Sequence, residues 1–514
     1  MLIGVDVGGT NTDAVLMDGA TLLAKAKCPT SGDVTSGVVA ALEKVLPNDS
    51  GQSIEGVMLG TTHFTNALLE QKGLAPTAVV RLALPATQLL PPLVDWPDDL
   101  RSAIGGFTYM ASGGHEFDGR EISSLDYTEL KKIALDMRKN GVEAIAMSGV
   151  FSPVDPTHER QAGAFFQSEM PHAQITLSNE NGRMGILERE NAATLNACLG
   201  KVGENSIRAI KQAMESLGLT APLYLSQNDG TLMDEGFAAR FPVFAIASGP
   251  TNSMRGAAYL SGLTDCIVVD VGGTTTDVGA LTNGFPREAS LAVNIAGVRT
   301  NFRMPDVVSI ALGGGSIVNP EPLVIGPESV GFRLEEQALV FGGNTLTATD
   351  IAVAGGLAQV GDPTLVSEVD SSLRRRSLEE IQRRVETVVD QVKLSPDPVP
   401  IVLVGGGSLL VGESMTGADQ VLRPDHGDVA NAIGAAIAQV GGQVEKVFSL
   451  EDIGRGEALA SIRSEAIGRA VAAGAEPTSV EVVELDEIPL TYLPGNVTLI
   501  RAKAVGDLGI LNSG

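Results

Sequence analysis

The sequence is poor in the features that mark secreted or membrane proteins. Its 3 cysteines lie far apart without a CxxC pair, so neither a disulfide framework nor a thiolate metal site is expected. No apolar run reaches the roughly 20 residues that a membrane span needs, and no signal-peptide pattern precedes the first apolar segment. We therefore expect reduced thiols, no membrane association and a cytoplasmic location.

Positive charge is also scarce. The chain holds 36 Lys and Arg against 62 Asp and Glu, for a net charge of −26. Such a chain repels nucleic acids and anionic lipid surfaces, although acidity can also serve solubility alone. If it binds a nucleotide, backbone N–H groups, helix termini and a divalent cation must meet the phosphates. The 5 histidines show no metal-ligand spacing.

An internal repeat is the strongest pattern present. Residues 4–16 read GVDVGGTNTDAVL and residues 268–280 read VVDVGGTTTDVGA, with the same spacing between equivalent positions. Each copy has an apolar run, a glycine pair and a second run rich in β-branched and apolar residues, which is typical of a β-hairpin. A single copy could be a glycine-rich turn capped by aspartate. Two matched copies predict two lobes of related fold.

The chain is too long for one hydrophobic core. Alternating strand and helix patterns predict an α/β lobe over residues 1–178 and a second lobe over 179–440. An alanine- and glycine-rich helix over Pro424–Val440 is expected to close the second lobe and to pack closely against another helix. Residues 441–514 predict a small α/β appendage with a helix over Glu457–Ala473.

The hairpins carry groups suited to phosphates. Glycines let backbone N–H groups approach a phosphate, and the neighbouring threonines add hydroxyl donors. A carboxylate beside a phosphate is repulsive unless a cation lies between them, so Asp6 and Asp270 predict Mg²⁺, held partly through water. The same carboxylates, and Asp13, could orient or deprotonate a nucleophile.

Two further glycine runs need separate interpretation. Gly405–Gly407 follows the apolar strand Ile401–Val404, and this position favours a turn against which a flat adenosine lies on bare backbone. Gly313 and Gly314 belong either to a phosphate or substrate loop or to a structural turn. No GxxxxGK[ST] motif is present, so the sequence does not predict a P-loop enzyme.

Taken together, the motifs resemble those of the ATP-dependent subunit of the hydantoinase/5-oxoprolinase family over nearly the whole chain. They are the two hairpins, GTTHFTNALLEQKG at 60–73, ASGP at 247–250, LGGGSI at 312–317 and VANAIGAA at 429–436. The resemblance implies the superfamily of acetate kinase, sugar kinases, heat-shock chaperones and actin. Its fold would be two ribonuclease-H-like lobes with an ATP cleft between them, plus the small C-terminal α/β region.

The resemblance also implies a reaction and a division of roles. The γ-phosphoryl group of ATP would pass to the carbonyl oxygen of a small cyclic amide such as a hydantoin, 5-oxoproline or lactam. Water would then open the ring, usually on a second, metal-bearing hydrolytic subunit. The implied first phosphate loop is Asp6, Gly8, Gly9, Thr10, Asn11 and Thr12, the second is Gly272, Gly273, Thr274 and Thr275 with Asp270 near Mg²⁺, and the adenosine loop is Gly405, Gly406 and Gly407.

Two alternatives remain open at this point. A small-molecule kinase of the same superfamily would release a stable phosphorylated product without a partner. A non-enzymatic ATP-dependent switch would bind nucleotide tightly and hydrolyse it slowly whatever the substrate. Asp13 and Asp277 could stabilise their hairpins instead of taking part in the chemistry, and a homo-oligomer is compatible with all three readings.

Overall fold

The computed structural model describes residues 1–30, 34–47, 53–289, 293–490 and 495–509. Within these residues the strands form three larger sheets and two separate hairpins. The largest sheet has the spatial order β22 (Glu481–Pro489), β23 (Val497–Gly506), β21 (Gln439–Ser449), β10 (Thr231–Asp234), β9 (Leu223–Ser226), β4 (Gly56–Thr61), β1 (Leu2–Val7), β2 (Asn11–Asp18) and β3 (Thr21–Pro29).

The second sheet carries the second copy of the repeat, and the third is parallel. The second has the order β13 (Phe285–Pro286), β12 (Thr276–Thr282), β11 (Cys266–Val271), β19 (Val399–Val404) and β20 (Ala418–Leu422), with β16 (Val307–Ile310) also paired to β12. The third has the order β6 (Phe107–Ser112), β5 (Thr77–Leu84), β7 (Ala144–Gly149) and β8 (Gln174–Leu177). The separate hairpins are β14 (Val293–Ile295) with β15 (Val298–Thr300), and β17 (Ser316–Pro320) with β18 (Leu323–Ser329).

Helices pack against these sheets. They are α1 (Val34–Val45), α2 (His63–Leu69), α3 (Asp98–Ala103), α4 (Tyr127–Lys139), α5 (Thr157–Glu169), α6 (Ser178–Asn181), α7 (Ile186–Ser216), α8 (Glu235–Arg240), α9 (Ser248–Ser261), α10 (Leu334–Gln337), α11 (Ala348–Ala354), α12 (Ser371–Val392), α13 (Ala430–Ala436) and α14 (Arg455–Ala472). Buried apolar residues of α1 and α7 join those of β1 and β4 in the largest core cluster, while α12 packs on β11 and β19. Burial of these apolar faces is the main stabilising contribution to the fold.

The predicted repeat is present in the strand pairing. In the antiparallel pair β1–β2, Asp6 lies opposite Asp13, and in β11–β12, Asp270 lies opposite Asp277. The neighbouring parallel strand is also equivalent, because β4 pairs with β1 and β19 pairs with β11. The sequence repeat therefore corresponds to two hairpins with the same register and the same type of neighbour.

Sheet membership does not follow the predicted boundaries at residues 178 and 440. The largest sheet combines strands from residues 2–61, 223–234 and 439–506, because β21 pairs with β10 on one side and β23 on the other. Residues 77–177 form the separate four-stranded sheet with its own core against α4 and α5. Sheet membership alone does not divide a chain into domains, so the division into domains stays a prediction.

The helix expected over Pro424–Val440 is shorter than its pattern suggested. Only α13 is α-helical in this segment, and β21 already begins at Gln439, because pairing with β10 and β23 overrides the helical pattern. The expected close packing against another helix is confirmed, since α13 lies on α9. A Cβ atom at Gly434 would stand 1.9 Å from the carbonyl oxygen of Asn252, so this contact requires glycine.

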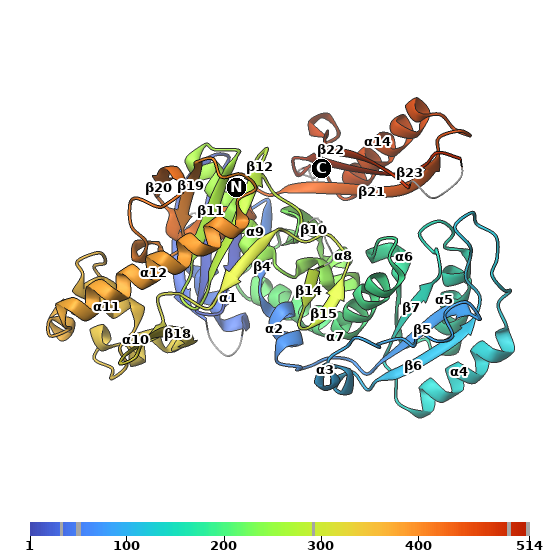
Figure 1. Ribbon diagram of the computed structural model, residues 1–514, viewed down its shortest axis with the longest axis horizontal. Coiled ribbons are helices and arrows are strands. Elements are labelled where there is room, and N and C mark those ends of the chain that lie inside the picture. The colour runs from blue at the N-terminus through green and yellow to red at the C-terminus, as the bar shows by residue number, and fades with distance from the viewer. Residues whose placement is uncertain (31–33, 48–52, 290–292, 491–494, 510–514) are drawn as a thin grey trace.

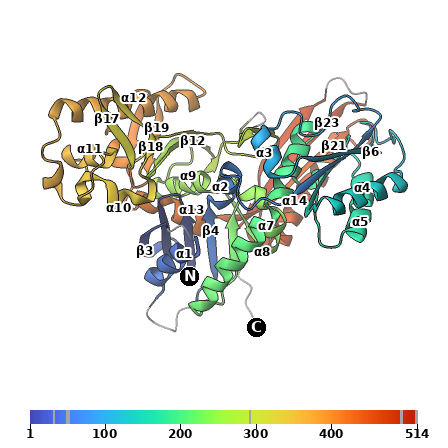
Figure 2. The same cartoon turned by 90° about the horizontal axis from the view of Figure 1, so that it is seen from below.

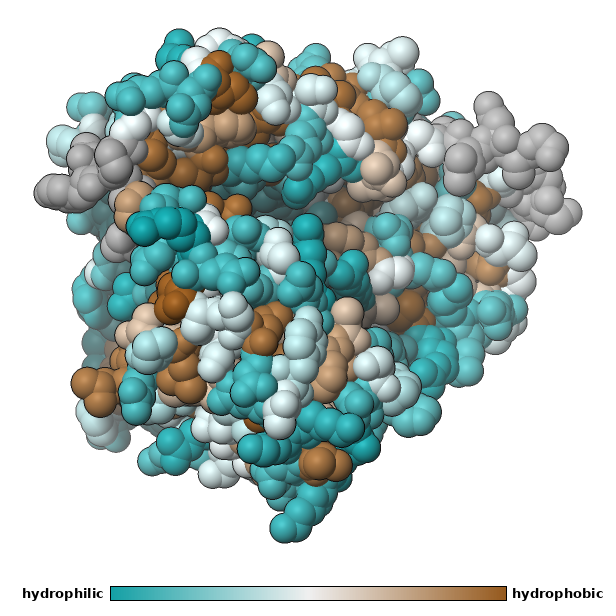
Figure 3. Space-filling view, turned by 90° about the vertical axis from the view of Figure 1, so that its right-hand side faces the viewer, coloured by the Kyte–Doolittle hydropathy of each residue, from teal (hydrophilic) through white to brown (hydrophobic). Residues whose placement is uncertain are grey.

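The molecule is elongated, with the hairpin sheets between two outer parts. Helices α10 to α12 lie at one end and the four-stranded sheet with α4 and α5 at the other (Figure 1), and Figure 2 shows the same order after a quarter turn. Among the described helices, none combines the length and the apolar character needed to cross a bilayer. The face shown in Figure 3 is largely hydrophilic, with hydrophobic residues scattered over it.

Candidate functional site

A cavity of about 930 Å³ lies between the turns of the two hairpins. The turns touch where the hydroxyl oxygens of Thr10 and Thr274 come within 3.2 Å of each other. A Cβ atom on Gly273 would lie 2.6 Å from the Thr10 hydroxyl, so glycine is needed for this approach. The two copies of the repeat, 264 residues apart in sequence, therefore form one site.

Most residues predicted from the sequence line this cavity. They are Asp6, Gly8, Gly9, Thr10, Asn11, Asp13, Asp270, Gly272, Gly273, Thr274, Thr275, Gly314, Gly405, Gly406 and Gly407. The N–H groups of Gly8 and Gly272 close their own turns, donating to the carbonyl oxygens of Asn11 at 3.0 Å and Thr275 at 2.9 Å. The other backbone N–H groups of the two turns remain available to a ligand.

Thr12 and Gly313 are not among the lining residues. Thr12 is fully buried, with its hydroxyl 3.4 Å from that of Thr30, because it pairs inside the sheet instead of standing in the turn. Gly313 packs on the second hairpin, where a Cβ atom would lie 2.7 Å from the carbonyl oxygen of Gly272. The next residue, Gly314, donates its N–H to that oxygen at 3.0 Å. The 313–314 turn therefore supports the second hairpin.

Asp6 is a strongly perturbed carboxylate of the site. It is 4% exposed, and its Oδ2 accepts a hydrogen bond of 3.0 Å from Asn431. Among the described residues, no hydrogen bond of ordinary geometry reaches its buried Oδ1, although the amide of Asn252 lies beside this oxygen and lowers the pKa of Asp6. Burial, followed by the negative charges of Asp13 and Asp270, raises the pKa of Asp6 to about 7. This carboxylate can therefore exchange a proton near neutral pH, or receive a cation at its free oxygen.

Asp13 has its own counter-ion. Lys27 lies 2.5 Å from Oδ1 of Asp13, and Asn431 donates to Oδ2 at 3.1 Å. Burial raises the pKa of Asp13, and the charge of Lys27 offsets part of that rise. Because Asn431 donates to both Asp6 and Asp13, this single amide from α13 holds the two carboxylates of the first hairpin in place.

The second hairpin carries a matching pair of carboxylates. Ser253 of α9 donates to Asp270 at 2.5 Å, and Ser309 of β16 donates to Asp277. Burial is the main cause that raises the pKa of both groups, to about 6 for Asp277. The second hairpin therefore also places two carboxylates on the cavity wall, each with a serine donor.

The carboxylates fit a cation that shares its ligands with phosphate. Within the described part of the chain, no three His, Cys, Asp or Glu side chains are grouped so that they alone could hold a metal. Asp6 nevertheless offers an unpartnered buried oxygen, and Asp270 lines the same cavity. Mg²⁺ commonly binds through one or two carboxylates, waters and phosphate oxygens, which suits this donor set.

One end of the cavity is apolar, and sequence reasoning found only its glycines. Beside Gly405–Gly407, this apolar end is formed by Phe332, Leu334, Phe341, Ala352, Ala358, Val360, Leu409 and Leu410. Gly405 has a positive φ of 84°, and a Cβ atom there would lie 2.2 Å from Asp270. A flat aromatic base fits such a surface, because bare backbone and apolar side chains can both contact its faces.

A second group of lining residues comes from other elements. This threonine end consists of Thr61, Thr62, Thr65, Asn66, Ile246, Ala247, Gly249, Pro250, Asn294, Ile295, Ala296, Met304 and Pro305. In Figure 1, α2 and the β14–β15 hairpin lie near the middle of the molecule, whereas α10 and α11 lie at one end. The cavity lining thus has an apolar end, with Glu335 and Thr349 beside it, the two hairpin turns with their carboxylates, and a threonine end with neutral polar groups.

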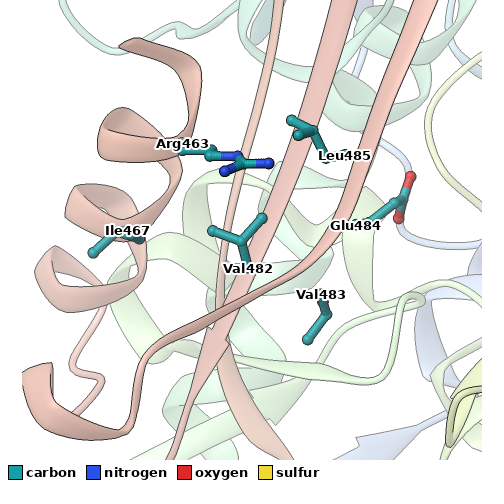
Figure 4. Close-up of a pocket in the computed structure, with 6 residues that line it drawn as sticks. All are labelled: Arg463, Ile467, Val482, Val483, Glu484 and Leu485. Carbon is teal, nitrogen blue, oxygen red and sulfur yellow. The ribbon is translucent and has the colours of Figure 1, made fainter. Parts of the chain in front are cut away.

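A smaller cavity of about 560 Å³ lies between α14 and β22. Arg463 extends from the helix toward the strand, while Glu484 points away from the helix (Figure 4), where it bonds to Arg303. Ile467, Val482, Val483 and Leu485 complete the lining. None of the residues singled out from the sequence lies there, so the larger cavity is the candidate active site.

Comparison with known proteins agrees with the motifs. Two profiles of one family match the chain, the hydantoinase/oxoprolinase N-terminal region over residues 2–170 and hydantoinase/oxoprolinase over residues 189–362. The chain belongs to the hydantoinase/oxoprolinase family. The resemblance stated from the sequence motifs is therefore confirmed.

Two similar proteins are named as subunits of enzymes. The caprolactamase subunit alpha of Pseudomonas jessenii is 26% identical over 464 residues, which cover 79% of this chain and 65% of the relative. The acetophenone carboxylase gamma subunit of Aromatoleum aromaticum is 26% identical over 400 residues, covering 69% and 53%. The chain thus spans between about half and two thirds of the length of these relatives.

Solved structures confirm the α/β fold class. The crystal structure of ATP-dependent caprolactamase from Pseudomonas jessenii superposes with a TM-score of 0.76 at 19% identity, over 98% of this chain and 87% of that one. A nucleotide-free acetone carboxylase superposes with a TM-score of 0.72 at 16% identity, over 99% and 88%. The description of the lobes as ribonuclease-H-like stays a prediction.

Proposed function

We propose that this chain binds ATP with Mg²⁺ between its two hairpin turns and transfers the γ-phosphoryl group to the carbonyl oxygen of a small cyclic amide. The contact of Thr10 with Thr274 carries the proposal, because it brings two phosphate-type turns to one cavity that also has an apolar end. The alpha subunit of caprolactamase is a relative, and a caprolactamase structure is titled ATP-dependent. These names support a lactam or related ring as the substrate.

Each part of the cavity has a role in this proposal. The base of ATP would lie at the apolar end against Gly405–Gly407, and the phosphates would lie between the two turns. Mg²⁺ bound by Asp6 and Asp270, partly through water, would neutralise phosphate charge. The ring would lie at the threonine end. Holding both reactants in one cavity favours in-line transfer between them.

The proposed reaction overcomes the weak electrophilicity of an amide carbonyl. The carbonyl oxygen of the amide forms a bond to the γ-phosphorus while the bond from that phosphorus to ADP breaks, and the ring nitrogen loses its proton. Because Asp6 would hold Mg²⁺ through its unpartnered Oδ1, this proton would pass to a water molecule and not to Asp6. Asn431 and the Lys27–Asp13 pair would keep Asp6 in position.

Ring opening then consumes two waters. The first adds to the activated carbon, the carbon–nitrogen bond breaks, and an acyl phosphate remains. The second water releases phosphate and leaves the open amino acid. The relatives are named as subunits, which supports a second, hydrolytic subunit for these later steps.

A carboxylase-type function is the second candidate. It is favoured by the acetophenone carboxylase gamma subunit, which is similar over 69% of this chain. In that case the carbonyl oxygen that accepts the phosphoryl group would belong to a ketone, and turnover would require bicarbonate. A requirement for bicarbonate therefore separates the two candidates.

The test is ADP release by the purified chain with Mg²⁺ and ATP, against hydantoins, 5-oxoproline, simple lactams and ketones with and without bicarbonate. Stimulation by a ring amide, lost in Asp270→Asn and Asp6→Asn, is the expected result. A stable phosphorylated product without a partner would indicate a simple kinase instead. Slow hydrolysis that no compound stimulates, together with tight ATP binding, would support the switch reading.

A further inference from the structure

The charge of the cavity wall separates classes of cyclic amide. Of the described lining residues, Lys27 is the single basic one, and it lies 2.5 Å from Asp13. The acidic lining residues are Asp6, Asp13, Asp270, Asp277, Glu335 and Asp428. Lys27 is therefore occupied by a buried carboxylate, and the wall has no other cation to offer a second anion.

The segments outside the described residues add no basic side chain to the cavity wall. The residues at 31–33, 48–52, 290–292, 491–494 and 510–514 include no lysine or arginine in the sequence. No cation from those segments can therefore compensate the carboxylates. Any free positive charge near the phosphates has to come with the nucleotide, as its metal ion.

The threonine end offers neutral groups only. Thr65, Asn66 and Asn294 contribute hydroxyl and amide groups, and Ile246 and Met304 contribute apolar surface. An uncharged ring amide needs one acceptor, one donor and apolar contacts, and this end supplies all three kinds. An ionised substituent would instead meet the carboxylates and the nucleotide phosphates without a counter-ion of its own.

We infer that this site selects uncharged cyclic amides, such as an unsubstituted lactam or hydantoin, over rings that carry a carboxylate, such as 5-oxoproline. The inference rests on the proposed function, because it assumes that the ring occupies the threonine end. It narrows that function to one class of substrate. The selectivity arises because an ionised ring finds no counter-ion in the cavity wall, and it does not depend on the size of the ring.

A matched pair of ligands tests the inference. 5-Oxoproline and 5-oxoprolinamide have the same ring and differ in one ionised group. Their binding is measured by calorimetry on the full chain saturated with Mg²⁺ and a non-hydrolysable ATP analogue, and their stimulation of ADP release is measured in parallel. We expect the amide to bind about tenfold or more tightly than the acid, as one uncompensated like charge at this range requires. Higher ionic strength should narrow the ratio.

The outcomes are distinct. Equal or tighter binding of the acid overturns the inference and leaves the proposed function standing. Binding of neither compound, and of no lactam in the panel, overturns the proposed function itself. Tighter binding of the amide, with a ratio that falls as salt is added, supports both.

A variant gives an independent check. Thr65 is half-buried on α2 and lines the cavity, so Thr65→Lys would place a free cation at the threonine end. It should tighten binding of 5-oxoproline and reduce the amide-to-acid ratio by about tenfold. Thr65→Met is the neutral control of similar length and should leave the ratio unchanged. An unchanged ratio in Thr65→Lys, with normal nucleotide binding, would contradict the placement of the ring.

Discussion

Asp6→Asn should stabilise the ligand-free protein while abolishing ATP turnover. The pKa of Asp6 is raised to about 7 from 3.8, chiefly by burial. The folded state therefore binds this proton more tightly than the unfolded state does. Below pH 3.8, the pKa of this group in the unfolded state, Asp6 does not lower the free energy of unfolding. As the pH rises from 3.8 toward 7, Asp6 lowers the free energy of unfolding progressively.

The magnitude follows from the size of the shift. A rise in the pKa from 3.8 to about 7 lowers the free energy of unfolding by roughly 4 kcal/mol above pH 7. This value is an upper bound, because structural relaxation around the charge reduces the loss. At pH 5 the folded group is protonated and the unfolded group is ionised, so the same shift corresponds to about 2 kcal/mol. Asparagine removes the charge and keeps an oxygen that can accept from Asn431.

The assay is thermal and urea unfolding of both proteins at pH 5 and pH 8, in EDTA and without nucleotide. The stability advantage of Asp6→Asn should grow by about 2–3 kcal/mol between the two pH values, as an upper bound. Asp18→Asn, on an exposed aspartate of the same hairpin, is the matched control and should show no such growth. An advantage that is absent, or equal at both pH values, would refute a buried, repelled carboxylate. With Mg²⁺ and ATP added, the wild type should gain more stability than the variant.

Three further changes probe the same site. Gly273→Ala should lower stability by about 1–3 kcal/mol in urea unfolding and weaken nucleotide binding, since its Cβ would meet Thr10, whereas the equivalent Gly9→Ala has open space and should leave stability unchanged. Ala358→Arg should fill the apolar end and weaken binding of a fluorescent ADP by more than about tenfold. Because Ala358 also packs against core residues, its unfolding midpoint is measured in parallel, so that loss of binding is scored only on folded protein. Lys27→Met removes the partly exposed counter-ion of a buried carboxylate and should cost about 1 kcal/mol at pH 8 and less at pH 5, where that carboxylate is more protonated.

The two hairpins could be predicted from the sequence because their determinants are local. A glycine pair between apolar runs fixes the turn, and the aspartates before and after it fall opposite each other in a hairpin. The repeat then implied that both turns serve one site. The pairing of Thr10 with Thr274 is the contact that this reasoning requires.

The apolar end could not be predicted in the same way. Phe332 and Phe341 belong to short turns and Ala358 to a loop, and none of these segments has a helical or strand period to place it. Their position depends on packing of the region beside α11 against the second sheet. Asn431 had a sequence signal, the VANAIGAA motif, but a lone amide among alanines does not reveal which carboxylates it will bridge.

The acidity of the cavity wall affects both the metal ion and the ring in the proposed reaction. Among the described lining residues no lysine or arginine is free, so under the proposed function the phosphates would meet neutral donors and a metal ion, which Asp6 and Asp270 would hold. The same carboxylates repel any additional anion. An uncharged ring adds no further negative charge to such a site, whereas an ionised ring adds one, so the repulsion that an ionised ring meets should weaken when a cation is introduced near it, as in Thr65→Lys.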